Sequence, residues 1–500
     1  MTASTIPAAL RAAAATYGDH PAVVEGDQVL TFAGLLDQVR ATAAGYVERG
    51  LEPGDRVCLW APNSTAWIVA GLAASYAGGT LVPINSRYTG HEAADIVDRT
   101  GARIVVVDDG FLGRSQIAEL RAASPLESVA EVIAIAALDE VAGTALEEAD
   151  ARADAVTADD VADILFTSGT TGRSKGAMSA HRQTIAVSDA WARIGGVTSE
   201  DRYLVVNPFF HSFGYKIGIV VSLLTGATLY PVATFDVDAV MRLIESARIT
   251  LLPGAPTIFT SLFDAPGRAE RDLSSLRLSI TGAAVVPVVL IERMRAPAPE
   301  GLGIDHVYTA FGMTEAVVVT MCREGDSDEL VATTCGRAIP GVETRIGEGG
   351  ELLVRGDIVM LGYLDDPEAT SKAIDADGWL HTGDVGTLDE DGNLKITDRL
   401  KDMYISGGFN VYPAEVEQAL ARLDGVADVA VIGVPDERMG EVGKAFVVRR
   451  AGTALEADEV IAFAKERLAN YKVPRQVAFL DVLPRNLGGK VLKNDLRGVT

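Results

Sequence analysis

The segment 164–176, Ile-Leu-Phe-Thr-Ser-Gly-Thr-Thr-Gly-Arg-Ser-Lys-Gly, has the composition of a loop that binds phosphate. An apolar run leads into Thr167, Ser168, Gly169, Thr170, Thr171 and Gly172, with Lys175 close behind. Glycines let backbone N–H groups approach an anion, hydroxyls add donors, and the lysine adds charge. The pattern differs from a Walker A loop, because Ser174 and Gly176 flank the lysine where that loop has Gly and Ser or Thr. A flexible surface turn is the alternative, but such a turn rarely combines a preceding apolar strand with so many donors.

Four further motifs follow in order, and with the loop they resemble the signatures of the adenylate-forming superfamily. They are Ala310-Phe-Gly-Met-Thr-Glu315, Gly378-Trp-Leu-His-Thr-Gly-Asp384, Thr397-Asp-Arg-Leu-Lys-Asp402 and Asn486-Leu-Gly-Gly-Lys490. That superfamily includes acyl-CoA synthetases, the adenylation domains of peptide synthetases, and luciferases. The resemblance spans almost the whole chain. It implies an AMP-forming acid–CoA ligase that uses ATP and Mg²⁺ to make an acyl-adenylate and then transfers the acyl group to coenzyme A.

The resemblance also implies which side chains act in the first step. The substrate carboxylate and the α-phosphate are both negative, so positive groups aimed at the developing charge must supply the catalysis. Lys490 is expected to bind the acyl oxygen and the α-phosphate, and Thr314 to bind the α-phosphate. Glu315 is expected to hold Mg²⁺ through an oxygen ligand. His211 is expected near the substrate carboxylate, although as a lone residue it would be assigned a structural role.

The contacts with the ribose and the adenine are expected from three further residues, Asp384, Arg399 and Phe311. Asp384 would accept hydrogen bonds from the ribose hydroxyls, as carboxylates do in dinucleotide folds, and Arg399 would assist. Taken alone, these two residues would be assigned to a surface ion pair or to core packing. Phe311 would stack on the adenine. The ATP site predicted in this way comprises Thr167, Ser168, Gly169, Thr170, Thr171, Gly172, Lys175, Gly282, Ala283, Ala284, Ala310, Phe311, Gly312, Met313, Thr314, Glu315, Asp384, Arg399 and Lys490.

A glycine-rich segment after residue 400 is a candidate for the CoA step. Residues 406–413, Ser-Gly-Gly-Phe-Asn-Val-Tyr-Pro, resemble the family segment that lines the pantetheine tunnel after the C-terminal domain has rotated. Gly407 and Gly408 lack side chains, so a thin pantetheine arm can pass them. Lys401 matches the family's hinge position. The alternative is an ordinary strand-to-helix turn, with Pro413 at the start of the helix.

The acid-binding residues are less sharply defined. Residues 207–216, Asn-Pro-Phe-Phe-His-Ser-Phe-Gly-Tyr-Lys, resemble the acyl-gate motif of the family. The four rings of Phe209, Phe210, Phe213 and Tyr215 are predicted to wall a short, wide pocket. A hydrogen-bond donor for a buried ketone is expected from Tyr215 or Lys216.

Longer stretches of sequence are closer to one subgroup than to the family at large. Residues 234–236, 272–277, 331–337 and 403–417 resemble actinobacterial ligases that activate the indanedione propanoate left when cholesterol has lost its A and B rings. This predicts a role in steroid degradation, a branch of lipid metabolism. Three alternatives stay open: a medium- or long-chain fatty acyl-CoA synthetase, an enzyme that loads a carrier protein or stops at acyl-AMP, and a non-catalytic nucleotide-binding protein.

The elements that must position these motifs alternate between helix and strand. Helical periodicity covers residues 35–49 and 66–77, and short apolar or β-branched runs cover residues 56–60 and 103–107. Such alternation predicts the α/β class, with parallel-type sheets covered by helices in a large N-terminal domain.

The pattern of predicted secondary structure changes in the last third of the sequence. From about residue 334, short strands and turns predict a β-rich subdomain. The segment after residue 398 has its own strands and helices, which predicts a small α+β domain. We therefore expect an AMP-binding domain at 1–398 and a mobile C-terminal domain at 399–500 that carries the catalytic lysine.

Length and charge set limits on function. A chain of 500 residues exceeds one hydrophobic core, which agrees with at least two domains. The net charge of −25 disfavours a general nucleic-acid or anionic-membrane binder, so anionic ligands must be held by local cationic sites. Residues 465–497 carry 8 basic and 3 acidic residues, which indicates a solvated helical face or a tail that meets phosphate.

The remaining sequence features favour an intracellular enzyme. Cys58, Cys322 and Cys335 have no CxxC spacing, so we expect reduced core thiols with neither a disulfide framework nor a zinc site. No secretory signal is expected, and the apolar stretch 67–84 is predicted to be a buried helix that runs into a strand. We expect a cytoplasmic protein whose partners are a small carboxylic acid, ATP and CoA, without nucleic acid. Whether it forms a homo-oligomer is left open.

Overall fold

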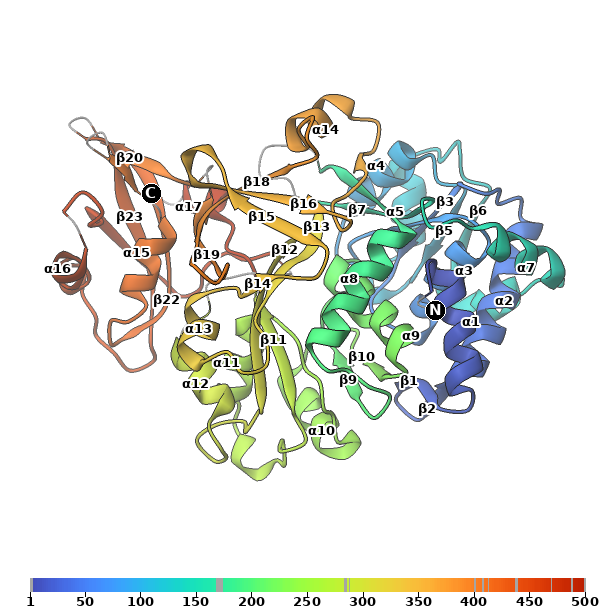
Figure 1. The fold of residues 1–500 in the computed structure, drawn as a ribbon, viewed down its shortest axis with the longest axis horizontal. Coiled ribbons are helices and arrows are strands. Elements are labelled where there is room, and N and C mark those ends of the chain that lie inside the picture. Colours follow the sequence, from blue (N-terminus) through green and yellow to red (C-terminus); the bar gives the residue numbers. More distant parts are fainter. Residues whose placement is uncertain are drawn as a thin grey trace.

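The structure is a computed structural model of the chain. It describes residues 3–167, 174–282, 286, 288–399, 402–406, 409–411, 413–436, 439–468, 470–486 and 489–498. Figure 1 shows the first helices at one end of the long axis, drawn in blue, and a separate group of strands and helices at the other end, drawn from orange to red.

A seven-stranded sheet positions the predicted phosphate loop. Its strands are β3 (Arg56–Trp60), β4 (Thr80–Pro83), β5 (Ile104–Val107), β6 (Glu131–Ala134), β7 (Val161–Phe166), β8 (Gly176–Ala180) and β17 (Gly362–Tyr363). They lie in the order β17-β8-β7-β4-β3-β5-β6. The strands from β7 to β6 are parallel, whereas β8 and β17 are added antiparallel at one edge. Strands β4 and β5 are buried throughout, as expected for parallel strands covered on both faces.

A second group of strands carries the predicted adenine and metal motif. Its members are β1 (Pro21–Glu25), β2 (Gln28–Thr31), β9 (Arg202–Val205), β10 (Thr228–Pro231), β11 (Leu278–Gly282), β12 (His306–Met313), β13 (Ala316–Met321) and β14 (Arg337–Ala338). They form the sheets β2-β1-β10-β9 and β11-β12-β13-β14, which isolated bridges through Leu251 connect. Strand β12 is parallel to β11 and antiparallel to β13, so the chain reverses at residues 314 and 315.

Helices cover these sheets. They are α1 (Ile6–Tyr17), α2 (Phe32–Glu48), α3 (Thr65–Tyr76), α4 (Gly90–Thr100), α5 (Gln116–Ala123), α6 (Leu138–Val141), α7 (Leu146–Ala155), α8 (His181–Ile194), α9 (Val221–Thr225), α10 (Val237–Ala247), α11 (Pro256–Asp264), α12 (Val288–Arg295), α13 (Asp328–Thr333) and α14 (Pro367–Ala373). Helix α3 is buried from Trp67 to Tyr76, and β4 follows it, as predicted for residues 67–84. Among the described residues, no helix combines the length and apolar character needed to cross a bilayer.

The last third of the chain forms two further sheets. Strands β15 (Val342–Ile346), β16 (Glu351–Gly356), β18 (Leu380–Leu388) and β19 (Leu394–Arg399) make the predicted β-rich subdomain. Strands β20 (Tyr404–Ser406), β21 (Phe409–Val411), β22 (Val426–Asp436), β23 (Gly440–Arg449) and β24 (Gln476–Leu480) make a five-stranded sheet. Helices α15 (Pro413–Leu420), α16 (Ala457–Arg467) and α17 (Lys493–Leu496) accompany it.

The predicted fold class is confirmed: large α/β sheets with helices, a β-rich subdomain and a small α+β unit. The sheets are mixed, because β8 and β17 extend the parallel sheet antiparallel. Two clusters of buried apolar residues beyond Tyr404 are separate from the two clusters of the preceding chain. The domain boundary at 398/399 stays a prediction.

A buried ion pair connects two elements of the large unit. Lys216 lies in the π-helical segment η3 (Phe213–Val220), and its Nζ is 3.0 Å from Asp163 Oδ1 in β7. The two side chains are 1% and 0% exposed. Thr184 donates a hydrogen bond of 3.0 Å to the second oxygen of Asp163.

We expect Lys216→Met to lower the free energy of unfolding by roughly 3–5 kcal/mol, because it leaves the Asp163 carboxylate buried without its counter-charge. Denaturant-induced unfolding measures the loss. The matched control is Lys372→Met, which removes an exposed pair with Glu368 and should cost at most about 1 kcal/mol. Equal, small losses in both variants would contradict the expectation.

Candidate active site

A cavity of about 1090 Å³ collects described residues from the predicted motifs. Its lining includes Thr167, Lys175, His211, Gly282, Ala310, Phe311, Gly312, Met313, Thr314, Glu315 and Lys490. These residues come from the two ends of the loop between β7 and β8, the segment before the helix at 213–220, β11, β12 and the turn after it, and the C-terminal segment 485–490. The volume is at the upper end of the range for small-molecule sites, as a nucleotide and a second substrate together require.

The predicted phosphate loop joins two antiparallel strands. Phe166 of β7 pairs with Gly176 of β8, and the Thr167 N–H donates to the Lys175 carbonyl over 2.9 Å. This bond closes the base of the loop and holds both residues at the cavity. The central residues Ser168, Gly169, Thr170, Thr171 and Gly172 lie outside the described residues, so their phosphate contacts stay a prediction.

The adenine and metal motif depends on a glycine that another backbone approaches. A Cβ on Gly312 would lie 1.9 Å from the Val317 carbonyl oxygen, and the β12–β13 register shifts between Phe311 and Met313. The shift brings Thr314 and Glu315 to the turn, where both line the cavity. Gly282 pairs with Ala310 across β11 and β12. Ala283 and Ala284 lie outside the described residues.

Tyr363 is a cavity residue that the sequence analysis missed. Its hydroxyl donates to Glu315 Oε1 over 2.7 Å, and the Lys175 ammonium lies 4.8 Å from the centre of its ring. The Met360 N–H donates to the Glu315 carbonyl over 2.8 Å. Gly362 and Tyr363 match no catalytic motif in the sequence, so only the structure shows that Tyr363 lies beside Glu315 and Lys175.

Glu351 holds the segment predicted to meet the ribose. Its Oε1 accepts a 2.9 Å hydrogen bond from the Gly383 N–H, and its Oε2 lies 2.9 Å from His381 Nδ1. Residues 380–383 line the cavity. Asp384 follows directly in β18 but is only 3% exposed and is not part of the lining. Its backbone pairs with Arg399 of β19, whose side chain lies outside the description, so the ribose role of both stays a prediction.

Lys490 reaches the cavity on a tight hairpin. The Asn486 N–H donates to the Lys490 carbonyl over 2.8 Å, and the Lys490 N–H donates to Asn486 Oδ1 over 2.9 Å. Between them, Gly489 has φ +80°, and a Cβ there would lie 3.3 Å from Ala255 Cβ. Glycine at position 489 therefore allows both the positive φ of the turn and the close contact with Ala255 of the large unit. The predicted hinge Lys401 and the CoA residues Gly407 and Gly408 lie outside the described residues.

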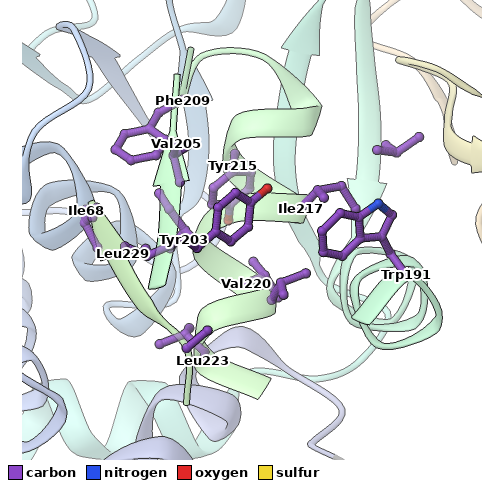
Figure 2. Close-up of a cluster of buried hydrophobic side chains, with 14 of the residues drawn as sticks. Ile68, Trp191, Tyr203, Val205, Phe209, Tyr215, Ile217, Val220, Leu223 and Leu229 are labelled. Carbon is purple, nitrogen blue, oxygen red and sulfur yellow. The ribbon is translucent and has the colours of Figure 1, made fainter. Parts of the chain in front are cut away.

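The acyl-gate prediction was half right. Phe210 and Phe213 line the cavity, whereas Phe209 and Tyr215 are fully buried and point into the core. Figure 2 shows them among Tyr203, Val205 and Leu229. Their rings pack on Trp67, with centroids 5.1 and 6.1 Å from its own.

The expected ketone donors were also wrong. Lys216 is engaged by Asp163 in the core, and neither Tyr215 nor Lys216 is part of the cavity lining. The physical reason lies at Gly214, in the first turn of η3. A Cβ on Gly214 would lie 2.2 Å from the Pro208 carbonyl oxygen, so the helix packs directly against the preceding residues of the motif. The side chains of Tyr215 and Lys216 therefore point into the core.

His211 is exposed to the cavity that it lines, and the surrounding protein partly desolvates its ring. The Phe213 N–H donates to His211 Nδ1 over 3.2 Å, which assigns the remaining ring proton to Nε2. Burial lowers the pKa of the imidazole, because the surrounding protein disfavours the charged form. The ring is therefore a neutral hydrogen-bond donor at neutral pH.

The cavity is locally cationic within an acidic protein. Among described residues its lining contains the cations Arg87, Lys175, Lys372, Arg485 and Lys490, against the carboxylates of Glu315 and Glu351. This fits the expectation that a chain of charge −25 needs a local cationic site for anionic ligands. The three thiols are not part of the lining, and burial raises the pKa of both Cys58 and Cys335 to about 12, which agrees with inert core thiols.

Comparison with known proteins identifies the class. The family described as AMP-binding enzyme matches residues 10–364, and the AMP-binding enzyme C-terminal domain matches residues 415–490. The fold also matches the crystal structure of ATP-bound MatB from Rhodopseudomonas palustris, with a TM-score of 0.87 at 32% identity, over 99% of this chain and 98% of that chain. The chain therefore belongs to the AMP-binding enzyme family, the adenylate-forming superfamily, as an AMP-forming acid–CoA ligase.

Two relatives are closer in sequence. The chain is 58% identical to the 3-[(3aS,4S,7aS)-7a-methyl-1,5-dioxo-octahydro-1H-inden-4-yl]propanoyl:CoA ligase of Rhodococcus jostii, over 99% of this chain and 98% of the relative. It is 57% identical to the ligase of the same name from Mycobacterium tuberculosis, with the same coverage.

We expect the ring protons of His211 to titrate with a midpoint below the ordinary histidine value of about 6.5, because burial disfavours the imidazolium. NMR of the protein labelled at histidine measures the midpoint, and the signal that disappears in His211→Gln assigns it. A midpoint at or above the ordinary value would show that the ring is solvated or paired with an anion.

Proposed function

We propose that this protein converts a carboxylic acid, ATP and CoA into an acyl-CoA in two half-reactions. One observation carries the proposal: a single cavity is lined by Lys175, Thr314 and Glu315, by His211 of the acyl-gate motif, and by Lys490 from the C-terminal unit. In the first half-reaction a carboxylate oxygen attacks the α-phosphate and pyrophosphate leaves. In the second, the CoA thiolate attacks the acyl carbonyl and AMP leaves.

In the first half-reaction, different residues of the cavity bind different groups of the two substrates. Lys490 neutralises charge between the acyl oxygen and the α-phosphate, and Thr314 donates to the α-phosphate. Lys175 holds the outer phosphates together with the loop 168–173. His211, with its proton on Nε2, donates a hydrogen bond to the substrate carboxylate and holds it for attack. Each group offers a donor or positive charge where negative charge builds up in the transition state.

The donor set of the cavity fits Mg²⁺ brought in with ATP. In the described part of the chain, no group of three or more His, Cys, Asp or Glu side chains is arranged to hold a metal. Glu315 supplies one carboxylate at the cavity, and Mg²⁺ at ATP sites is bound by one or two carboxylates plus phosphate oxygens. Bound there, the ion would neutralise phosphate charge, and Glu315 would be its protein ligand.

The residues assigned to the CoA step, the domain division at 398/399 and the cytoplasmic location remain proposals from the sequence. Gly407 and Gly408 would pass the pantetheine arm, and Lys401 would be the hinge. The inert, buried thiols support this scheme, because the acyl group then needs no cysteine to carry it between AMP and CoA.

We propose that the acid is the steroid-derived indanedione propanoate. The identity of 58% and 57% to two ligases named for this acid supports the assignment. The rings of Phe111, Phe210, Phe213 and Phe235 line the cavity and suit a rigid apolar bicycle. The hydroxyls of Ser212 and Thr257, also in the lining, are candidate donors for its ketones, since an unpaired buried polar group costs about 1–3 kcal/mol.

Lys490→Ala is expected to abolish adenylation, measured as acid-dependent exchange of pyrophosphate into ATP, and to leave thioester formation from supplied acyl-adenylate largely intact. The reason is that the lysine acts on the α-phosphate, which has already reacted in the adenylate. Arg497→Ala, in the same C-terminal segment, is the control. A folded variant that loses both half-reactions equally would count against this role.

The steroid-derived propanoate should be used with a kcat/KM at least about a hundredfold above that for octanoate or palmitate, the ratio that roughly 2.7 kcal/mol of differential transition-state binding gives. A panel of acids assayed with ATP and CoA measures it. Comparable values for palmitate would replace the steroid assignment with that of a fatty acyl-CoA synthetase.

A further inference from the structure

We propose that Tyr363 is a positioning residue that orients the Glu315 carboxylate and the Lys175 ammonium, and thereby sets the metal requirement of adenylation. The inference rests on the proposed function of the cavity.

The phenol is held between two groups of opposite charge. Its hydroxyl donates to Glu315 Oε1 over 2.7 Å, and its ring centre lies 4.8 Å from Lys175 Nζ, within the range of a cation–π contact. Glu315 is only 8% exposed, so few water molecules can replace that hydrogen bond. With Oε1 engaged, Oε2 is the oxygen that remains for a cation.

The backbone fixes Tyr363 to both ATP-binding elements. In β17, Tyr363 pairs with Ala177 of β8, and the Leu364 N–H donates to the Gly176 carbonyl over 2.8 Å. These contacts are directly adjacent to Lys175. On the other side, the Met360 N–H donates to the Glu315 carbonyl over 2.8 Å. The segment 360–364 therefore joins the phosphate-loop hairpin to the metal motif, and the phenol adds the side-chain link.

The chemistry of metal sites gives this link a function. Groups that hydrogen-bond a ligating carboxylate fix its orientation, and their removal typically costs 10–100-fold in metal affinity or activity. Without the hydroxyl, the Glu315 carboxylate can rotate, and the ring still covers Lys175. The loss should therefore appear in the dependence on the metal and leave metal-free nucleotide binding unchanged.

The test compares Tyr363→Phe with the wild type in two measurements. The first is the Mg²⁺ concentration for half-maximal pyrophosphate exchange, which we expect to rise at least about tenfold. The second uses no turnover: electron paramagnetic resonance of Mn²⁺ with the protein and ATP should show a similar loss of Mn²⁺ affinity. Calorimetric binding of ATP in EDTA should stay within about twofold.

A matched control separates this role from a structural one. Tyr76 donates a 2.6 Å hydrogen bond to Asp150 Oδ1 and is not part of the cavity lining. Tyr76→Phe removes the same phenol–carboxylate bond, so it should affect thermal stability without changing the metal titration. In the double variant Glu315→Gln/Tyr363→Phe, the metal requirement should match that of Glu315→Gln alone, because the tyrosine acts through that carboxylate.

An unchanged metal titration in Tyr363→Phe, or an equal loss of ATP binding in EDTA, would overturn the inference. So would additive effects in the double variant. Failure of the proposed function is distinguishable: the wild type would then show no acid-dependent exchange with any acid, while the Mn²⁺ measurement would still report on Tyr363. If Tyr363→Phe does not fold, Glu315→Gln must still reduce Mn²⁺ affinity, or the premise is wrong.

Discussion

Electrostatic repulsion is the constraint on which this structure depends. A carboxylate and the α-phosphate of ATP must come into contact inside a protein of net charge −25. Their repulsion is strongest where water is excluded, so cationic groups have to be fixed in advance at the point of contact. The cavity meets this constraint with cations from separate parts of the chain, among them Lys175 beside the phosphate loop and Lys490 on the C-terminal hairpin.

Backbone hydrogen bonds anchor each of these cations at the cavity. Lys175 sits at the base of a hairpin that the bond from Thr167 closes, and β17 extends that hairpin to the turn that carries Glu315. Lys490 sits on a turn that requires glycine at position 489. Long flexible side chains lose entropy when ordered, so anchoring their backbones close to the target limits how far each must reach.

Where local residue types mark a segment, the sequence predicted which segments would meet. The ends of the hydroxyl-rich loop, the Thr314-Glu315 pair and Lys490 line one cavity, and helix α3 is buried as its apolar composition predicts, whereas the roles of these site residues stay predictions. Contacts that depend on which strands pair, and in which register, could not be predicted. Tyr363 matters because β17 pairs with β8, a contact between segments that lie far apart in the chain. Phe209 and Tyr215 look like pocket residues but are buried in the core. Tyr215 lies in the π-helical segment η3, and no simple periodicity marks such a helix.

The core also explains how the phosphate-loop strand and the acyl-gate motif are held at a fixed separation. Asp163 lies on the strand that leads into the phosphate loop, and its partner Lys216 is the last residue of the acyl-gate motif, within η3. Asn63 adds to this link, because its side chain donates to the carbonyls of Val205 and Asn207 and accepts from the Phe209 N–H. Both walls of the cavity thus belong to one packed body, whereas Lys490 comes from the C-terminal segment. The large unit thus holds the phosphate-loop and acyl-gate segments in one packed body, and the hairpin that carries Lys490 meets this body at Ala255.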